Sequence, residues 1–350
     1  MRKKPECLDH RQHISLSNYA YDIVVNDSID FMGKKNMSGF INTIIANTKT
    51  DSIECLAETE FNRLKEVLKK EKLSQGEEDT IKRLAKAHMN SIIHPQEKYP
   101  KDKTLKIRLN NDMYDVFYES GDWDGEKHGI LPGDYIKLLV ERYARMTYFE
   151  RESVYYKDEI EKITTYIKEQ NLLKLTLKSG SKYYFKPYHL SKAYEANYHY
   201  LIGYSKAEGK DKYIIAPIRL SRIPKGKIKK LSDSGKITKK EKEEIEKRIK
   251  LSGIAYALSE PEENVIKLTP DGYKTYKNKY HQRPLYKGND PEPDEDGNYE
   301  MTITATDIQI ENYFFEFRGE AIVISPEHTR KRMLEWYELS SQRYKNIPGT

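Results

Sequence analysis

The stretch HISLSNYAYDIV (residues 13–24) recurs as KIRLNNDMYDVF (residues 106–117), with five of the twelve positions identical. Farther along each copy, SGFIN (residues 38–42) corresponds to GDYIK (residues 133–137), and an aliphatic pair follows both. Each copy predicts a short alternating strand, a first helix, a loop with glycine and a second helix. A lone strand leaves its edge unpaired, so we expect the strands of the two copies to pair within one chain.

This order of elements resembles a ribbon-helix-helix fold, in which two short strands pair antiparallel above four helices. Strand alternation sends Ile14, Leu16, Ile107 and Leu109 inward. In the family that it resembles, the outward positions read the DNA major groove. Here those positions are His13, Ser15, Ser17, Lys106, Arg108 and Asn110. The alternative is a fold kept for assembly, whose outward face contacts no DNA.

The composition excludes several classes of protein. The chain has 350 residues, of which 37% are hydrophobic and 33% charged, and this length predicts two or three domains. It contains neither an apolar stretch long enough to cross a membrane nor a signal peptide, so we expect a cytoplasmic protein without a membrane partner. Two cysteines are too few for a disulfide framework or a four-ligand zinc site.

Charge and tyrosine are unevenly distributed. Residues 225–250 hold eleven Lys and Arg against five Asp and Glu, which equals the net charge of +6 for the whole chain. Half of the 28 tyrosines lie between Tyr135 and Tyr213. Such a mild basic excess permits nucleic-acid binding without demanding it.

The tyrosine-rich segment predicts a small antiparallel barrel of the SH3 or Sm type. A helix at Asp158–Gln170 precedes short alternating strands with tight turns between them. We expect the strands at Leu172–Lys178, Lys182–Pro187, Tyr198–Tyr204 and Lys212–Leu220.

Three motifs in this segment together resemble a WYL domain: KPYHL (residues 186–190), HYL (199–201) and IRLSRI (218–223). In that family the tripeptide is usually Trp-Tyr-Leu, and this chain has His199 in the first position. The family usually carries two arginines three residues apart on the last strand, and Arg219 and Arg222 match that pattern. The resemblance implies a pocket for single-stranded nucleic acid or a nucleotide.

The chemistry of these residues points the same way. An arginine guanidinium is suited to phosphate and stacks on bases, while aromatic rings stack on any base. Arg219 and Arg222 leave an ideal strand on opposite faces, so they converge only if the strand bends. The alternative is that Tyr200 belongs to the core and Arg222 to a structural ion pair. The predicted nucleic-acid-binding residues are Arg219, Arg222, His189, Tyr188, Tyr200, Lys186, Lys225, Lys227 and Arg283.

The C-terminal part alternates strands and helices and resembles the ferredoxin-like extension that accompanies many WYL domains. After a turn at SDSG (residues 232–235), Thr238 is expected to cap a helix. Helices are then expected from Thr269-Pro270, Asp307 and Ser325-Pro326, with Gly319 ending the second of them. The expected strands are Ile254–Leu258, Val265–Leu268, Met301–Thr306 and Ala321–Ile324.

No motif in the sequence indicates catalysis, a metal or a cofactor. The acidic loop at 292–297 begins like a calcium loop, but its twelfth position is Ile303 instead of Glu. The segment Gly203–Asp211 has the wrong spacing for a phosphate-binding loop, and the nine histidines show no metal-ligand spacing. We therefore expect a protein that is not an enzyme and has no cofactor or metal.

The complete layout predicts a multidomain α+β protein. Its parts are a duplicated ribbon-helix-helix domain (1–150) with a helical insert between the copies (residues 52–94), a WYL domain (151–230) and a C-terminal extension (231–350). This order resembles the WYL accessory proteins of type VI CRISPR systems, which implies binding of single-stranded RNA and stimulation of an RNA-guided CRISPR nuclease. One alternative is a transcriptional regulator that grips operator DNA with the ribbon and senses a nucleotide or nucleic-acid effector. Another is a scaffold for a partner protein, and a homodimer would form through the C-terminal region.

Overall fold

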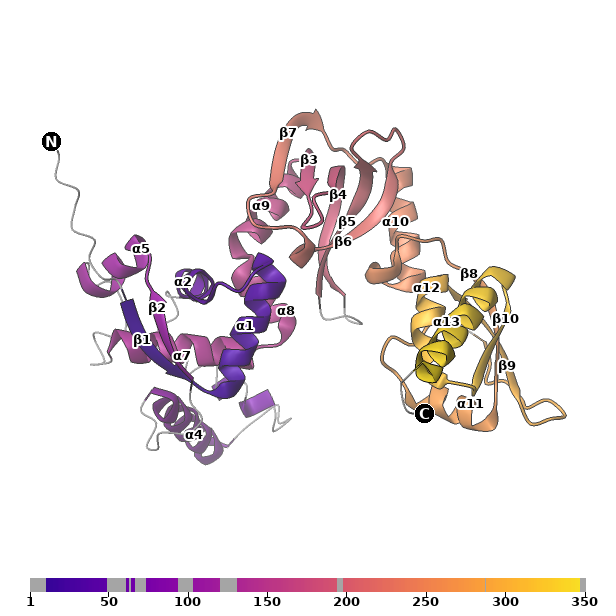
Figure 1. Cartoon of the computed structure of the whole chain (residues 1–350), viewed down its shortest axis with the longest axis horizontal. Helices are drawn as coiled ribbons and strands as arrows, with labels where there is room; N and C mark the ends of the chain where they lie inside the picture. The colour runs from indigo at the N-terminus through magenta and orange to yellow at the C-terminus, as the bar shows by residue number, and fades with distance from the viewer. Residues whose placement is uncertain are drawn as a thin grey trace. The chain divides into compact units, whose positions relative to one another are not determined.

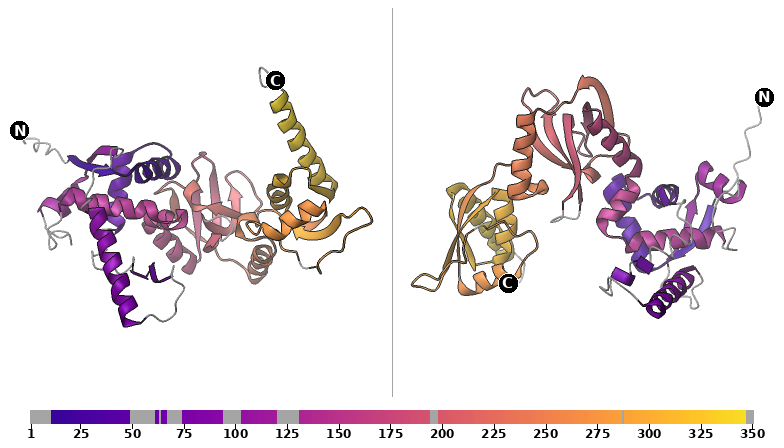
Figure 2. Two further views of the ribbon diagram at one scale, coloured as in Figure 1. Left: turned by 90° about the horizontal axis from the view of Figure 1, so that it is seen from below. Right: turned by 180° about the vertical axis from the view of Figure 1, so that it is seen from behind.

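The computed structural model describes residues 11–48, 61–62, 64–66, 74–93, 103–119, 131–193, 198–286 and 288–346. The chain divides into two compact units, Met1–Ile160 and Glu161–Thr350, and each is described by itself (Figures 1 and 2). Both combine helices with antiparallel sheet, so the predicted α+β class is confirmed. Within the described ranges, no helix has the length and apolar character needed to cross a membrane.

The first unit is built on the predicted pairing of the two repeated strands. Strand β1 (Arg11–Leu16) pairs antiparallel with β2 (Lys103–Arg108), with His13 opposite Lys106 and Arg11 opposite Arg108. The predicted alternation is confirmed, because the four inward residues are no more than 3% exposed: Ile14, Leu16, Ile107 and Leu109. The apolar side of the ribbon thus lies against the helices of the unit.

Each strand leads into a capped helix, as the repeat predicts. Ser17 caps α1 (Asn18–Met32) by accepting from the Ala20 amide, and Asn110 caps α5 (Asn111–Tyr114) by accepting from the Met113 amide. A π-helical turn, η1 (Asp115–Glu119), continues α5. The placement of Ser17 and Asn110 on the outward face of the strands is therefore wrong, because both follow the strand ends and their side chains bond to helix backbone.

The second helices of the two copies are α2 (Met37–Thr48) and α7 (Pro132–Arg145). Phe40 and Tyr135, which occupy corresponding positions in the repeat, are both fully buried. Among the described residues, the unit also has the helices α4 (Gln75–Ile93), α8 (Tyr148–Tyr155) and α9 (Lys157–Lys168), of which α9 runs into the second unit. The helix expected over residues 52–94 lies partly outside the described residues.

A buried ion pair joins three helices of the first unit. The Arg151 guanidinium of α8 lies 2.7 Å from the Asp27 carboxylate of α1, and these side chains are 10% and 4% exposed. Tyr143 of α7 donates its hydroxyl to the same carboxylate at 2.7 Å. Arg151 also donates to the carbonyl of Met146 at 2.7 Å, so the buried guanidinium has both a carboxylate and a carbonyl as hydrogen-bond acceptors.

The second unit begins with a five-stranded antiparallel sheet in the order β6-β5-β4-β3-β7. The predicted strands and hairpins are present as β3 (Asn171–Thr176), β4 (Lys182–Ala193), β5 (Tyr198–Ala207) and β6 (Ile214–Arg219). The turn expected at residues 232–235 is wrong, because β7 (Ile228–Ser234) pairs with β3 as far as Ser234 opposite Asn171. The basic composition of this segment concealed a strand whose lysines point to solvent.

Helix α10 (Lys239–Ser252) covers part of this sheet. The predicted cap is confirmed, because Thr238 and Glu241 form a reciprocal capping box at its start. Ile245 packs against Ile202, Tyr204 and Ile215 of the sheet. The strand expected at Ile254–Leu258 is instead the 3-10 turn η3 (Ile254–Tyr256), which buries Ile254 and Ala257 against the same cluster.

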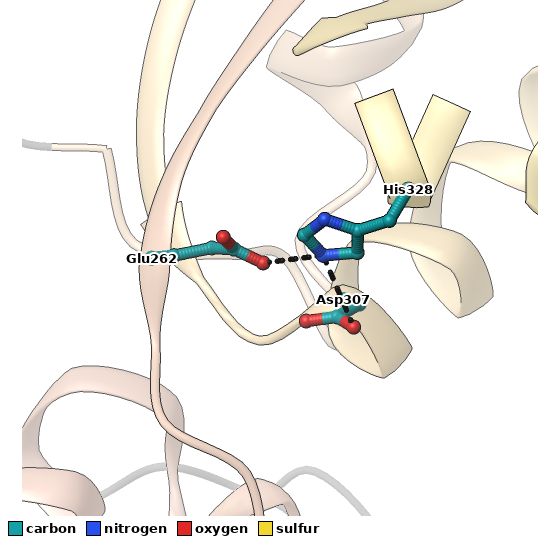
Figure 3. Close-up of side chains that lie close together, drawn as sticks. All are labelled: Glu262, Asp307 and His328. Atoms are coloured by element: carbon teal, nitrogen blue, oxygen red, sulfur yellow. Dashed lines mark hydrogen bonds and ion pairs between the residues drawn. The ribbon is translucent and has the colours of Figure 1, made fainter. Parts of the chain in front are cut away.

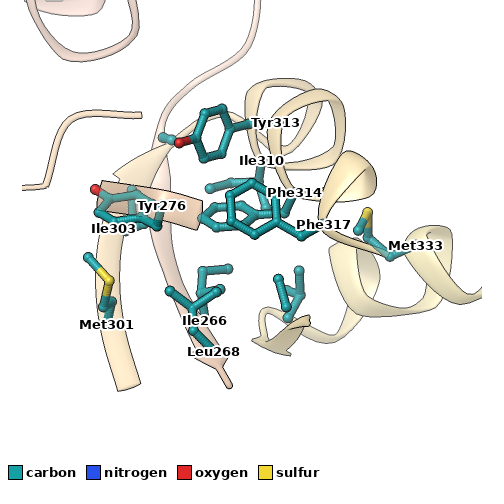
Figure 4. Packing of buried hydrophobic residues seen from close by; sticks show 13 residues of the cluster. Ile266, Leu268, Tyr276, Met301, Ile303, Ile310, Tyr313, Phe314, Phe317 and Met333 are labelled. Carbon is teal, nitrogen blue, oxygen red and sulfur yellow. The ribbon is translucent and has the colours of Figure 1, made fainter. Parts of the chain in front are cut away.

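The end of the chain forms a three-stranded sheet with helices packed against it. Strand β8 (Glu262–Leu268) lies between β10 (Ala321–Ser325) and β9 (Tyr299–Ala305). The helices of this part are α11 (Pro270–Asn278), α12 (Asp307–Phe314) and α13 (Glu327–Lys345). Figure 4 shows the core that the sheet and these helices enclose. The caps differ in detail from prediction. Thr306, one residue before Asp307, caps α12, and α12 ends at Phe314 followed by a turn at Phe315–Phe317, well before Gly319.

Candidate nucleic-acid interface

The two arginines of the predicted pocket lie at the end of β6. Arg219 is the last residue of the strand, and the 3-10 turn η2 (Leu220–Arg222) follows at once. That turn supplies the bend without which the two side chains would leave on opposite faces. Leu220 is fully buried, which anchors the turn, while the Arg222 side chain is exposed.

Two tyrosines of β5 lie beside these arginines. The guanidinium of Arg219 is 3.3 Å from the centre of the Tyr198 ring, a stacked cation–π contact. Arg219 is also the register partner of Tyr200. Burial raises the pKa of Tyr200, and the positive charges of Arg219 and Arg222 oppose that rise. Both arginines therefore lie close enough to the Tyr200 hydroxyl to act on it electrostatically.

The strand register also brings His189 toward this cluster. On β4, Ser191 lies opposite Tyr200 and His189 lies opposite Ile202, so His189 is a diagonal neighbour of Tyr200. A register shift lies between Pro187 and His189, and the His189 side chain is exposed. An aromatic donor and acceptor is thus exposed on β4, with β5 between it and Arg219.

Tyr188 and Lys186, by contrast, are engaged with helix α10. The Tyr188 hydroxyl donates to Glu246 at 2.6 Å, and burial followed by this carboxylate raises its pKa to about 12. The Lys186 ammonium lies 3.3 Å from Glu241 and 4.9 Å from the centre of the Tyr213 ring. These two side chains hold α10 to the sheet. They are therefore paired with acidic residues of that helix and not grouped with Arg219 and Arg222.

The basic segment at residues 225–250 does not extend the pair Arg219 and Arg222 along one strand. The segment after Arg222 curls toward β3: the Lys178 amide donates to the Arg222 carbonyl, and the Thr176 amide donates to the Lys227 carbonyl. It then enters β7, which lies at the opposite edge of the sheet from β6. Lys225 and Lys227 thus lie in the connection between the two edges.

Arg283 belongs to the C-terminal part of the second unit. Its guanidinium stacks over the rings of Tyr280 and Tyr276, at 4.6 and 5.3 Å from their centres. It also donates to the Tyr276 carbonyl at 3.3 Å. These contacts give Arg283 a packing role near α11, and no contact joins it to the cluster around Arg219 among the described residues.

The outward face of the ribbon is more basic than the predicted residues indicate. Arg11 and Arg108 are opposite and exposed, as are His13 and Lys106 one pair farther along. Ser15 lies opposite Thr104, with 3.3 Å between the two hydroxyl oxygens. Arg11 was missed because it precedes the repeated segment, although its place two residues before His13 would have revealed it.

Two tyrosines near Arg219 and Arg222 were also absent from the predicted site residues. Tyr198 lies two residues before Tyr200 and thus on the same face of β5, a signal that period-two alternation offers. Tyr256 is close enough to Tyr200 to affect its pKa, yet it comes from η3, a segment expected to be a strand. The assembled cluster, which we call the arginine–tyrosine cluster, comprises Arg219, Arg222, Tyr198, Tyr200 and Tyr256.

The fold as a whole has a counterpart among solved structures. The chain superposes on the crystal structure of a CRISPR Cas-related protein with a TM-score of 0.69 at 20% sequence identity, covering 96% of this chain and 94% of that one. The two chains therefore share one fold over nearly their entire length.

Other comparisons give little. A structure of proteasome accessory factor B/C of Arthrobacter aurescens aligns at a TM-score of 0.25 and 12% identity, over 69% of this chain and 37% of that one, which is too low to indicate a shared fold. The sequence matches no protein-family model and no curated protein.

Proposed function

We propose that this chain is a non-catalytic CRISPR accessory protein that binds single-stranded RNA and stimulates an RNA-guided RNA nuclease. The observation that carries the RNA proposal is the arginine–tyrosine cluster, with Arg219 stacked at 3.3 Å on Tyr198 and Arg222 exposed beside it. The CRISPR part of the proposal is supported by the whole-chain likeness to a CRISPR Cas-related protein.

In this proposal the first unit is a ribbon-helix-helix pseudo-dimer, the five-stranded sheet is a WYL domain, and residues from about α10 onward form its ferredoxin-like extension. The antiparallel pairing of β1 with β2 supports the first assignment. The arginines on the last strand and turn of the sheet support the second.

The cluster offers the two kinds of contact that unstructured RNA needs. Arg222 is exposed and would bind a phosphate, for which the planar guanidinium is well suited. The Arg219–Tyr198 stack presents a flat cationic surface on which a base can stack, and each such stack contributes about 1–3 kcal/mol. His189 can donate to or accept from a base edge or a 2′-hydroxyl, because its imidazole is exposed.

A binding experiment tests the RNA proposal directly. Fluorescence anisotropy would compare single-stranded RNA and duplex DNA across a salt series, with Arg219→Ala and Arg222→Ala. The matched control is Arg330→Ala, an exposed arginine on α13 of the same unit. We expect only the two cluster substitutions to weaken RNA binding. Equal RNA affinity of all three variants and the unmodified protein would refute the assignment of the site.

The nuclease proposal needs its own measurement. Cleavage of a reporter RNA by an RNA-guided CRISPR nuclease would be followed with and without this protein. Stimulation that disappears with Arg219→Ala is the expected result. Unchanged cleavage at saturating protein, with RNA binding intact, would leave an RNA-binding protein that does not modulate the nuclease.

A second candidate function is favoured by the ribbon. The pairs Arg11–Arg108 and His13–Lys106 place cationic groups on the exposed side of β1 and β2, as a strand inserted in the major groove would require. On this proposal the chain is an operator-binding regulator whose WYL domain binds an effector. Tight, sequence-selective duplex binding that is lost in Lys106→Ala with Arg108→Ala would favour it. Binding to neither polymer would favour a scaffold for a partner protein.

A further inference from the structure

Three side chains far apart in the sequence converge at one end of the central strand of the C-terminal sheet. They are Glu262 at the start of β8, Asp307 at the first residue of α12 and His328 at the second residue of α13. The His328 Nε2 atom lies 2.8 Å from a Glu262 oxygen and 3.5 Å from an Asp307 oxygen. Figure 3 shows the imidazole pointing between the two carboxylates.

These distances match the spacing of ligands around one small cation. Metal bonds of about 2.0–2.2 Å set neighbouring ligand atoms about 3–3.5 Å apart in tetrahedral or octahedral geometry. One ligand atom from each of the three residues lies within 4.8 Å of the other two. Small rotations of exposed or half-buried side chains would therefore suffice to close the set around an ion.

The charge around the three residues also favours a dication. Arg332 lies 3.2 Å from Asp307 and 2.9 Å from Glu311, and Glu262 adds a third carboxylate beside His328. With the imidazole neutral, the group carries two negative charges in excess. Glu311 is buried, with 8% of its surface exposed, and burial raises its pKa while Arg332 opposes that rise. A divalent ion would neutralise the excess that Arg332 leaves.

We propose that Glu262, Asp307 and His328 bind a first-row divalent transition metal, with Zn²⁺ as the reference ion. An imidazole with two carboxylates selects this class over Mg²⁺ and Ca²⁺, which prefer oxygen ligands alone. Three protein ligands leave a further position for water. The ion would tie β8 of this sheet to the starts of two helices, and it would replace the hydrogen bond between His328 and Glu262.

The sequence offered no signal for this site, because its ligands are separated by 45 and 21 residues, and the metal motifs of sequence analysis are local. The folded chain alone brings them together. The site is independent of the arginine–tyrosine cluster, so failure of either proposal leaves the other standing.

Isothermal titration of the full-length, untagged and chelator-stripped protein with Zn²⁺ tests the proposal. The protein carries Cys7→Ser and Cys55→Ser, so that no thiol competes for the metal. We expect one Zn²⁺ per chain, and binding at least about tenfold weaker with His328→Ala or Asp307→Asn, since even outer-shell groups change metal affinity about 10- to 100-fold. The matched control is His281→Ala, an exposed histidine of the same unit outside the triad.

A thermal melt separates loss of the site from loss of the fold. Zn²⁺ should raise the unfolding temperature of the protein and of His281→Ala, but should leave that of His328→Ala unchanged. If His328→Ala already melts lower without metal, Glu262→Gln provides the second test. Zn²⁺ affinity that is the same in the triad variants and in the control would overturn the proposal, as would the absence of Zn²⁺ binding to all of them.

Discussion

Replacing Arg151 should destabilise the first unit far more than an ordinary surface substitution. In Arg151→Met the aliphatic stem is kept and the guanidinium is lost, so the Asp27 carboxylate, only 4% exposed, retains the Tyr143 hydroxyl but no cation. Breaking a buried pair in this way costs about 3–5 kcal/mol. At about 1.4 kcal/mol per factor of ten, amide exchange limited by unfolding of this unit should accelerate about 100-fold to a few thousand-fold.

The pH dependence of this defect has a definite sign. Burial already raises the pKa of Asp27 in the intact protein, and Arg151 opposes that rise, so the substitution should raise the pKa further. A carboxyl with a higher pKa in the folded state binds its proton more tightly when folded. Its contribution to stability is therefore present at low pH and is lost as pH rises through the folded pKa. Arg151→Met should thus be closest to the unmodified protein in acid.

Hydrogen exchange measured by mass spectrometry is the suitable assay, because it reports each segment separately. Peptides from α1 and α7 should lose protection, after correction for the intrinsic exchange rate at each pH, while peptides of the second unit serve as the internal control. The double variant Asp27→Asn with Arg151→Met should recover part of the protection, since it leaves no buried charge. Exchange in α1 that rises less than about tenfold at pH 8, or that is equal in the single and double variants, would refute the reasoning.

Three further outcomes follow from other contacts. Arg219→Lys should weaken RNA binding by about 1–3 kcal/mol in anisotropy titrations, because an ammonium lacks the flat stacking surface of the guanidinium, and full affinity in this variant would speak against stacking. Glu141→Gln should lower stability by about 1–3 kcal/mol in denaturant melts, since the buried carboxylate accepts from the Ser17 amide at 2.6 Å and hydroxyl at 2.9 Å; an unchanged midpoint would contradict this. Gly203→Ala should disrupt the pairing of β4 with β5, because the new Cβ would lie 2.0 Å from the Lys186 carbonyl oxygen, and native protection of β5 amides in this variant would show that the sheet can yield.

The local features of the fold were accessible from the sequence. The inward residues of the ribbon follow from alternation, and the caps at Thr238 and Thr269 follow from side-chain chemistry that acts within three residues. The strand β7 was missed for a physical reason. Its lysines face solvent at the edge of a sheet, so the segment lacks the apolar alternation that marks a half-buried strand.

The candidate sites were accessible only in part. The spacing of Arg219 and Arg222 was visible, but their convergence depends on the turn η2, and that turn is held by the burial of Leu220. Lys186 and Tyr188 have residue types suited to RNA, yet the folded chain pairs them with acidic side chains of α10. Long-range pairing of this kind decides whether a cation is available to a ligand, and alternation along one strand carries no information about it.

The placement of β1 and β2 in one polypeptide has a genetic consequence. A ribbon made from two identical chains changes on both sides with every mutation, and it falls apart on dilution. Here a mutation of His13 leaves Lys106 unchanged. The pairing of β1 with β2 is intramolecular, so it does not depend on the protein concentration. Each half can thus diverge without its counterpart, so the two sides of the exposed surface need not remain alike.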